Sequence, residues 1–408
     1  MNILFLADNF PPELNAIASR VYERACYWVA WGHEVAVITS VPNFPDGKVF
    51  DGYRNRWYQV ESVNGIRVVR VKTFVAKNEG LVLRTLDFLS YMFSSFWAGL
   101  IEPRPDVVVA TSPQFFVAVA GWAIAATRRL PFVMEIADLW PASIRAVGAI
   151  QDNTIIRILE RVELFLYRRS AKVVALTPAF KDDLVKRGIP AEKVNVIING
   201  VDLKRYYPLP PCLQLKKALN LDGCFVVGYL GTLGMAHALH CVLDAAEVIQ
   251  KTHRSVRFLF VGPGAARERL VQDAKQRDLS NVIFVEAQLK ERMPLYWSIC
   301  QVSLVHLKNV SLFATVIPSK IFEAMGMGVP TLVAAPEGAA TAIVRETGAG
   351  VVAAAEDPGE LISAIVRLCE EPDRLRMLGT KALIAAPLYS REEQARRTLM
   401  TLQEVLAG

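Results

Sequence analysis

Short apolar runs rich in Val, Ile and Leu alternate with longer helical patterns along the whole chain. Such alternation predicts a parallel sheet with helices on both faces. Expected helices include 17–31, 81–101 and 238–252. Expected strands are 3–7, 34–39, 66–71, 107–110, 132–136, 173–176 and 194–197, then 225–230, 257–261, 282–285, 302–306, 330–334 and 351–352. Because the pattern occurs twice, the sequence predicts an α/β protein with two doubly wound, Rossmann-like domains.

The two halves are separated by the turn-forming, proline-rich stretch NGVDLKRYYPLPP, residues 199–211. A stretch of this composition suits a linker, and a chain of 408 residues is long enough for two domains. We therefore expect an N-terminal domain over 1–200 and a C-terminal domain over 201–388. Residues 389–408 include a helix that is charged on one face and apolar on the other, and we expect it to pack back onto the first domain.

The composition is that of a globular protein, with 52% hydrophobic and 21% charged residues. Six cysteines without a C-x-x-C pair are typical of reduced thiols in a cytosolic protein. The opening MNILFLADNF is interpreted as a buried strand rather than a signal peptide. The net charge of +6 is modest and no nucleic-acid-binding motif accompanies it, so a nucleic-acid partner is not expected.

Basic residues gather just before an aromatic segment, 86–101 (LDFLSYMFSSFWAGLI). The basic run is either a solvated face or a surface that meets anionic lipid. The apolar segment is interrupted by Asp87 and is shorter than the roughly 20 residues that a spanning helix needs. It is therefore either a buried domain helix or an interfacial helix. The basic run comprises Arg54, Arg56, Arg67, Arg70, Lys72, Lys77 and Arg84.

The second half opens with a strand that runs directly into a glycine turn, VVGYLGTLG, before a helix expected to start near Ala236. Glycines at a strand–helix turn allow the backbone to approach a phosphate, and the helix N-terminus offers free N–H groups. Such turns also serve only to pack a helix on a sheet. The candidate phosphate-binding residues here are Gly231, Thr232, Gly234 and His237.

A stronger constellation is IPSKIFEAMGMGVPTLVAA, residues 317–335. Pro318 and Ser319 mark a helix start. Lys320 falls in the first turn, where a pyrophosphate could meet both its ammonium and open backbone N–H groups. Glu323 follows one turn later and could accept both hydroxyls of a ribose. The alternative is a capped surface helix with a solvated lysine and glutamate.

Other polar residues are weaker candidates. His237 and His240 have i, i+3 spacing, but no third metal ligand is evident, and His237 fits better beside a phosphate. Glu13 and Asn15, just after the first strand, are polar residues of a stretch that could be a surface loop. No clustered ligands indicate a metal, and no cofactor is expected.

Together these motifs resemble the family 4 retaining glycosyltransferases of the GT-B fold, over essentially the whole chain. The motifs PNFPDGK (42–48), DLWPASI (138–144) and PSKIFEAM are most similar to a bacterial branch that builds O-antigen or capsule and includes N-acetyl-L-fucosamine transferases. Other matching pieces are DNFPPE (8–13), WGHEVAVIT (31–39), NGVD (199–202), GYLGTLG, VGPG (261–264) and FEAMGMGVP.

The resemblance implies roles for single residues. Glu323 matches a glutamate that contacts ribose, whereas an earlier glutamate of the family is Thr315 here. The family's pyrophosphate-binding Arg and Lys correspond to Tyr229 and Leu233, which leaves Lys320 as the replacement.

Further positions follow from the same resemblance. Ala137 stands where a histidine often precedes an aspartate, so Asp138 is the remaining polar group. Asp138, Lys320 and Glu323 form the implied catalytic set. The implied donor-binding residues are Gly231, Thr232, Gly234, His237, Gly262, Thr315, Ser319, Lys320 and Glu323. Glu13 and Asn15 lie where the family's acceptor loop lies, and are either acceptor-binding residues or simply part of a surface loop. The motif Asp-x-Asp, which is used elsewhere to hold a metal on the pyrophosphate, is absent from the sequence.

The expected activity is transfer of a sugar from a UDP-sugar, in the second domain, to an undecaprenyl-diphosphate-linked saccharide, in the first. The enzyme is expected in the cytoplasm, peripherally on the inner face of the membrane. Two alternatives remain: a nucleotide-sugar epimerase of the same form, and a catalytically silent nucleotide-sugar-binding protein, motivated by Thr315 and Ala137.

Overall fold

The computed structural model describes residues 1–13, 15–44, 46–75, 81–112, 114–139 and 154–408, which form two compact units. Unit 1 comprises Met1–Ile198 and Arg391–Gly408, and unit 2 comprises Asn199–Ser390. Each expected strand is present, with ends that move by one residue at most. The prediction of an α/β protein with two Rossmann-like sheets is therefore confirmed.

Unit 1 contains an eight-stranded sheet in the order β3-β4-β2-β1-β5-β6-β7-β8. All neighbours pair in parallel except β3 and β4. The strands are β1 Asn2–Leu6, β2 Glu34–Ser40, β3 Tyr58–Val63, β4 Ile66–Val71, β5 Val107–Thr111, β6 Phe132–Ile136, β7 Lys172–Ala175 and β8 Val194–Val196.

Strand β3 was not expected from the sequence. It forms a hairpin with β4 through Asn64 and Gly65, both of which have positive φ, 50° and 80°. That is the pairing of residues that tight hairpin turns prefer.

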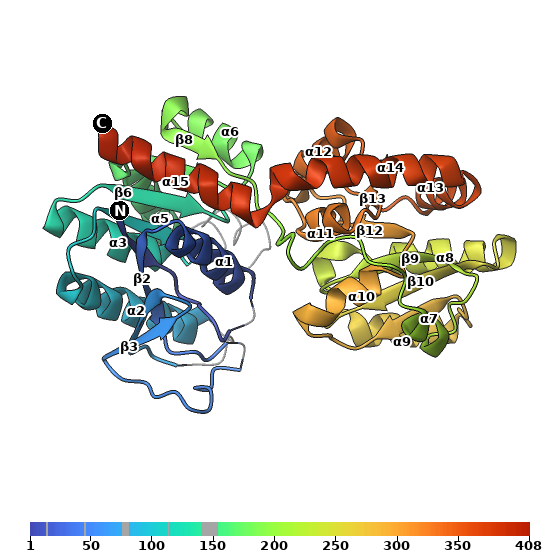
Figure 1. The fold of residues 1–408 in the computed structure, drawn as a ribbon, viewed down its shortest axis with the longest axis horizontal. Coiled ribbons are helices and arrows are strands. Elements are labelled where there is room, and N and C mark those ends of the chain that lie inside the picture. The colour runs from blue at the N-terminus through green and yellow to red at the C-terminus, as the bar shows by residue number, and fades with distance from the viewer. Residues whose placement is uncertain (14, 45, 76–80, 113, 140–153) are drawn as a thin grey trace. The chain divides into compact units, whose positions relative to one another are not determined.

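Helices cover both faces of this sheet (Figure 1). One face packs against α1 and α15, and the other packs mainly against α2 and α3. The helices of unit 1 are α1 Ala16–Ala30, α2 Leu81–Ile101, α3 Phe115–Arg128, α5 Thr154–Arg169, α6 Pro178–Lys186 and α15 Arg391–Ala407, with the 3₁₀ turn η1 Ala191–Lys193.

The C-terminal helix α15 is an integral part of unit 1. Its Ala395, Leu399 and Leu402 are buried in the same core as strands β1 and β2. The indole Nε1 of Trp28 on α1 donates to the carbonyl oxygen of Ala395 at 2.9 Å. The unit is therefore completed by a segment that follows all of unit 2 in the chain.

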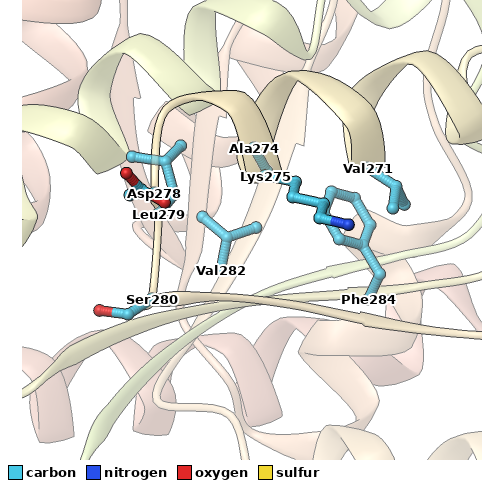
Figure 2. A pocket seen from close by; sticks show the side chains of 8 residues that line it. All are labelled: Val271, Ala274, Lys275, Asp278, Leu279, Ser280, Val282 and Phe284. Atoms are coloured by element: carbon cyan, nitrogen blue, oxygen red, sulfur yellow. The ribbon is translucent and has the colours of Figure 1, made fainter.

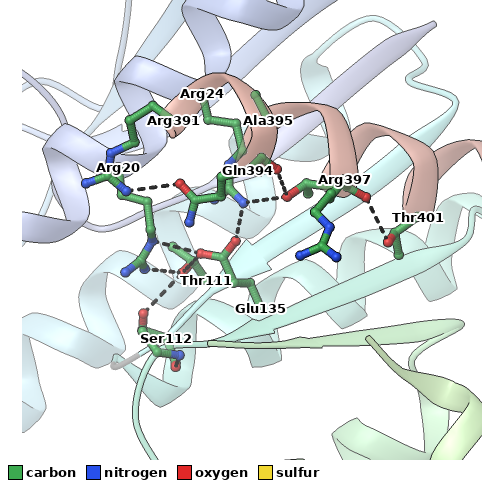
Figure 3. A network of polar contacts seen from close by, with 12 residues as sticks. Arg20, Arg24, Thr111, Ser112, Glu135, Arg391, Gln394, Ala395, Arg397 and Thr401 are labelled. Carbon is green, nitrogen blue, oxygen red and sulfur yellow. Dashed lines mark hydrogen bonds and ion pairs between the residues drawn. The ribbon is translucent and has the colours of Figure 1, made fainter. Parts of the chain in front are cut away.

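A buried polar network joins α1, β6 and α15 (Figure 3). Glu135 on β6 is fully buried and lies 3.1 Å from Arg20 Nε and 2.5 Å from Arg24 Nη1. Burial acts to raise the pKa of Glu135, but the charges of Arg24 and Arg20 outweigh it and lower the pKa to about 2. Arg24 also donates to Thr398 Oγ1 of α15 at 3.2 Å. This network holds α15 against the sheet through charged groups that depend on one another.

Unit 2 contains a six-stranded parallel sheet in the order β11-β10-β9-β12-β13-β14. The strands are β9 Phe225–Leu230, β10 Val256–Val261, β11 Val282–Val285, β12 Val302–His306, β13 Thr331–Ala334 and β14 Gly350–Ala353. The helices are α7 Leu213–Ala218, α8 His240–Thr252, α9 Arg267–Gln276, α10 Met293–Trp297, α11 Lys320–Met327, α12 Ala339–Thr347, α13 Pro358–Glu370 and α14 Pro372–Ala385. Short 3₁₀ turns are η2 Met235–His237, η3 Lys290–Arg292, η4 Ser311–Thr315 and η5 Ala386–Tyr389.

Candidate functional site

The strand order of unit 2 marks where a ligand would bind. The chain proceeds from β9 outward to β10 and β11, then returns to β12 on the other side of β9 and continues to β13 and β14. In open α/β sheets, ligands bind beyond the carboxyl ends of the strands at such a switch point. At these carboxyl ends, Gly231 directly follows β9, and His306 is the last residue of β12.

The glycine turn after β9 is tightly built. Gly231 has φ 134° and its N–H donates to the carbonyl oxygen of Val261 at 2.8 Å. A Cβ on Gly262 would lie 2.2 Å from the carbonyl oxygen of Gly231, so only glycine fits at this neighbouring turn. The Tyr229 hydroxyl donates to the carbonyl oxygen of Thr232 at 2.9 Å and fixes the loop. The predicted turn residues are thus held together by backbone contacts.

Lys320 reaches this same turn from α11. Its Nζ lies 3.3 Å from the centroid of the Tyr229 ring, and a Cβ on Gly231 would lie 3.4 Å from it. The side chain is buried, and Nζ has no hydrogen-bond partner among the described residues. Burial lowers the pKa of Lys320 to about 7, although the charge of Glu323 acts to raise it. A buried cation that lacks a partner is suited to receive an anion.

Glu323 and Ser319 lie on the same helix start. The helix begins at Lys320, as predicted, and Ser319 is its N-cap residue, but the Ser319 side chain makes no capping hydrogen bond. Glu323 is partly buried, and its Oε2 accepts a hydrogen bond from Trp297 Nε1 of α10 at 3.3 Å. Trp297 was not identified from the sequence, because it comes from a different helix and belongs to no recognised motif.

His237 is held by a reciprocal pair of hydrogen bonds with His306. His306 Nδ1 lies 2.7 Å from the His237 carbonyl oxygen, and His237 Nδ1 lies 3.2 Å from the His306 carbonyl oxygen. Since carbonyl oxygens only accept, both Nδ1 atoms carry the hydrogen. Burial and the nearby charge of Lys320 lower the pKa of His237 to about 4. In the protein without a ligand, His237 is therefore a neutral imidazole with no hydrogen on Nε2, and its place beside a phosphate stays a prediction.

The helix after the glycine turn starts later than predicted. The helix expected to start near Ala236 begins at His240, because Met235–His237 form the separate turn η2 and Ala238 is left-handed with φ 43°.

Thr315 ends η4, and its hydroxyl donates to the carbonyl oxygen of Leu312 within the same turn at 2.8 Å. Within the described ranges, no three His, Cys, Asp or Glu side chains gather as a metal site.

The candidate acceptor residues of unit 1 have structural partners. Glu13 is buried rather than part of a surface loop, and Oε1 accepts the main-chain N–H groups of Asn43 and Phe44, both at 2.9 Å. Asn15 is the N-cap of α1 and accepts the Ala18 N–H at 2.9 Å. Both residues shape the loop after β1. Asp138 follows the end of β6 and is partly buried; the remainder of its motif beyond Leu139 lies outside the described residues.

Asp8 is a residue that the sequence analysis missed. It follows β1, which lies between β2 and β5 at the switch point of the unit 1 sheet. Burial, together with the charges of Asp87 and Glu13, raises its pKa well above the usual range. Asp8 begins the DNFPPE motif, and its position at a carboxyl strand end was the signal that could have found it.

The aromatic segment on α2 is only partly exposed. Tyr91 is fully buried and donates its hydroxyl to the Ile38 carbonyl oxygen, so this aromatic side chain of 86–101 does not face outward. Phe93 and Trp97 are 60% and 63% exposed. In the basic run, Arg67 pairs with Glu102 and the buried Arg70 pairs with Glu61, whereas Lys77 lies outside the described residues. Among the helices that the structure describes, none is long and apolar enough to span a bilayer.

A separate hollow lies between α9 and β11 on the outer edge of the unit 2 sheet (Figure 2). Its wall is mostly apolar and includes Val271, Leu279 and Phe284. No predicted donor-binding residue lines it. The hollow is therefore not part of the candidate site at Gly231 and Lys320.

The sequence matches known proteins over both units. Residues 15–200 match the glycosyl transferase 4-like domain, and residues 224–371 match glycosyl transferases group 1. The chain is 25% identical over 411 residues to a protein of Escherichia coli K12 named as the colanic acid biosynthesis glycosyl transferase WcaI, covering 98% of this chain and 96% of the relative. It is 24% identical over 387 residues to a GDP-mannose-dependent alpha-mannosyltransferase of Mycobacterium tuberculosis, covering 94% and 92%.

Solved structures share the fold over the full length. Sucrose-phosphate synthase from Thermosynechococcus elongatus has a TM-score of 0.77 at 16% identity, covering 100% of this chain and 99% of the other. Anabaena HepE in complex with UDP-glucose has a TM-score of 0.72 at 20% identity, covering 99% and 100%. The chain therefore belongs to the glycosyltransferases of the GT-B fold, with a glycosyl transferase 4-like first domain and a group 1 second domain.

Proposed function

We propose that the protein transfers a sugar, such as an N-acetylated deoxyhexosamine, from a UDP-sugar to an undecaprenyl-diphosphate-linked saccharide during synthesis of a surface polysaccharide. The observation that carries the donor part is the buried Lys320 amino group at the Gly231 turn, which has no hydrogen-bond partner among the described residues. The relative named for colanic acid biosynthesis supports the polysaccharide part, and HepE in complex with UDP-glucose supports uridine.

In this proposal Lys320 and the backbone N–H groups of the glycine turn bind the pyrophosphate. Negative charge develops on the leaving phosphate as the glycosidic bond breaks, and the ammonium of Lys320 beside it stabilises that charge most in the transition state. Glu323, oriented by Trp297, accepts the ribose hydroxyls. Asp138 belongs to unit 1, which binds the acceptor in this proposal. The anomeric configuration is retained, and activity survives chelation because no metal is required.

The test is a binding screen followed by product analysis. UDP, GDP and their sugar conjugates are titrated against the protein, since one relative is named for GDP-mannose. The preferred donor is then mixed with an undecaprenyl-diphosphate-linked saccharide, and products are identified by mass spectrometry with and without EDTA. Tighter binding of GDP would overturn the uridine assignment. Turnover of the donor with no acceptor would favour an epimerase, and binding without transfer would favour a silent binding protein.

We also propose that unit 1 docks on an anionic membrane surface through the outer side of α2. Leu83, Leu86, Phe93, Trp97 and Ile101 recur at helical spacing and are each between 45% and 68% exposed. An exposed apolar stripe of this size is uncommon on a protein that stays in water.

Neighbouring residues extend the stripe and add positive charge. Phe74 is 46% exposed, and its N–H donates to Ser90 Oγ of α2 at 2.7 Å. Arg84 lies over the Phe88 ring, and Lys72 lies over the exposed Trp57. Basic residues beside an apolar stripe favour an interfacial position on anionic lipid, at about 1 kcal/mol for each basic residue near the surface.

Co-sedimentation with vesicles tests this surface. We expect binding that rises with phosphatidylglycerol content and falls in high salt, because the charge attraction is screened. The double variant Phe93→Ser/Trp97→Ser should bind several-fold less. Ile384→Ser, which removes an equally exposed apolar side chain from α14 in unit 2, is the matched control. Absence of the wild-type protein from the pellet at every lipid composition would disprove docking.

A further inference from the structure

Tyr229 and Lys320 form a contact that donor binding alone does not explain. The ammonium of Lys320 lies over the face of the Tyr229 ring, at 3.3 Å from its centroid, and is removed from water. The ring attracts a cation but replaces only part of its lost hydration. Tyr229 itself is fixed, because it is buried and its hydroxyl is bonded to the Thr232 carbonyl oxygen.

The charged groups that face Lys320 are few. Glu323 lies on the same helix, and its negative charge acts on Lys320. The Glu323 carboxylate also accepts a hydrogen bond from Trp297 of α10. His237 of η2 is neutral, and its partner His306 at the end of β12 is buried with a lowered pKa caused by that burial. Loss of hydration therefore outweighs the attraction of Glu323.

Among the described residues, the other segments packed on α11 bring no charged group that shifts the pKa of Lys320. The loop 203–206 meets α11 through its main chain and the apolar Leu203 side chain. Strand β13, Thr331–Ala334, carries no ionisable side chain. Helix α14 meets the end of α11 at Gly328 through the apolar side chain of Leu383. The turn η5 meets it through Tyr389, whose ring stacks on Phe322. Within the described residues, Lys320 is thus left with the Tyr229 ring and with Glu323.

We propose that Tyr229 is a positioning residue, which holds Lys320 at Gly231 without a hydrogen-bonded counter-ion. The diphosphate of the donor then supplies this counter-ion, and donor binding takes up one proton at Lys320. The proposal rests on the donor site of the preceding section. The step is Lys–NH₂ plus a solvent proton giving Lys–NH₃⁺ beside the phosphate oxygens.

The expected consequence is a pH-dependent affinity. With its pKa lowered to about 7, Lys320 in the free protein is mainly the neutral amine above that pH. Phosphate oxyanions raise the pKa of an adjacent amine in the complex. Between the two pKa values, the affinity for UDP should fall roughly tenfold for each unit of pH.

Calorimetry of UDP binding in buffers of different ionisation enthalpy measures the proton count. At about pH 8 the phosphates of UDP are already fully ionised, so uptake by the nucleotide is suppressed. We expect close to one proton for each UDP in the wild type and in Tyr229→Phe, which keeps the ring. Lys320→Arg should bind UDP with almost no uptake, because a guanidinium stays charged. In Tyr229→Leu, water reaches the amine and the uptake should fall below about half. Equal uptake by the wild type and Lys320→Arg would overturn the proposal.

A titration of the free protein separates this inference from the proposed function. Lysine labelled with ¹³C at Cε gives a signal for Lys320, assigned by its loss in Lys320→Arg. Its midpoint should lie near 7 in the wild type and in Tyr229→Phe. A midpoint near the ordinary lysine value of about 10 would overturn the inference even if UDP binds. If UDP fails to bind while the midpoint lies near 7, the proposed donor site fails instead.

Discussion

The buried position of Lys320 suits ligand binding but makes the folded protein less stable. Its lowered pKa means that the folded protein binds fewer protons than the unfolded chain between about pH 7 and 10.5. The contribution of Lys320 to the free energy of unfolding therefore rises with pH through that window and is least favourable below it. Such a position is typical of a side chain kept for a ligand rather than for folding.

The substitution Lys320→Met tests this conflict. Without nucleotide, the variant should be more stable than the wild type by about 1–3 kcal/mol at pH 6, since an unpartnered buried charge is removed. The difference should shrink toward pH 9, and UDP should no longer stabilise the variant. Urea unfolding monitored by fluorescence gives these values. Lys251→Met, at a 72% exposed side chain, should change nothing. A destabilised Lys320→Met would show that the ammonium supports the fold.

Glu323→Gln is expected to weaken UDP binding by about 1.5–3 kcal/mol, because a charge-assisted acceptor of hydroxyl groups becomes a neutral one. The fold should persist, since an amide oxygen can still accept from Trp297. Glu337→Gln, at an exposed glutamate paired with Arg345, is the control. Isothermal calorimetry measures the change, and unaltered affinity would remove Glu323 from the site.

For single residues, the sequence predicted which side chains lie together only where they are close in the chain. Ser319, Lys320 and Glu323 share one helix start and could be placed together from their spacing. Tyr229, Trp297 and His306 could not be assigned to the site by spacing, because each reaches it from a different element. The burial of Glu13 could not be predicted, because its main-chain partners, Asn43 and Phe44, follow another strand.

Among the elements, the alternating strands and helices were predictable because buried parallel strands are continuous apolar runs. Strand β3 was not, because YQVESV lies at the sheet edge and alternates polar and apolar residues without a strong apolar face. Helix α15 was recognisable as amphipathic, but its charged partners on α1, Glu23 and Arg24, lie more than 360 residues earlier in the chain.

The contact between α15 and the sheet depends on Glu135. Glu135→Gln would leave Arg20 and Arg24 buried without a full counter-charge, and should lower the free energy of unfolding by about 3–5 kcal/mol. The stabilising effect of Glu135 is present above the ordinary glutamate pKa and is lost only as pH falls through about 2. Denaturant unfolding at pH 7 measures the loss. Glu404→Gln on α15, where the carboxylate is exposed and 3.8 Å from Lys172, should cost almost nothing. A loss below about 1 kcal/mol would mean that the network is not required.

At the scale of the whole molecule, the proposed donor-binding residues all belong to unit 2, which is one continuous segment. A protein limited to 199–390 should therefore fold and bind UDP within about tenfold of the full chain, because it keeps its own core. It should show no transfer activity. Calorimetry and thermal unfolding test this, with Lys320→Ala in the same fragment as the control. A folded fragment without affinity for UDP would mean that unit 1 contributes to the nucleotide site.

Unit 1, by contrast, is interrupted in the chain, and this sets the order in which the molecule can be completed on the ribosome. Domains usually fold from the N-terminus as they emerge. Here β1 to β8 emerge first but lack α15, whose Ala395, Leu399 and Leu402 belong to their core. All of unit 2 is synthesised before that helix appears. The second unit can therefore reach its native state while the first still exposes an apolar sheet face, and the first unit depends on the last helix for its completion.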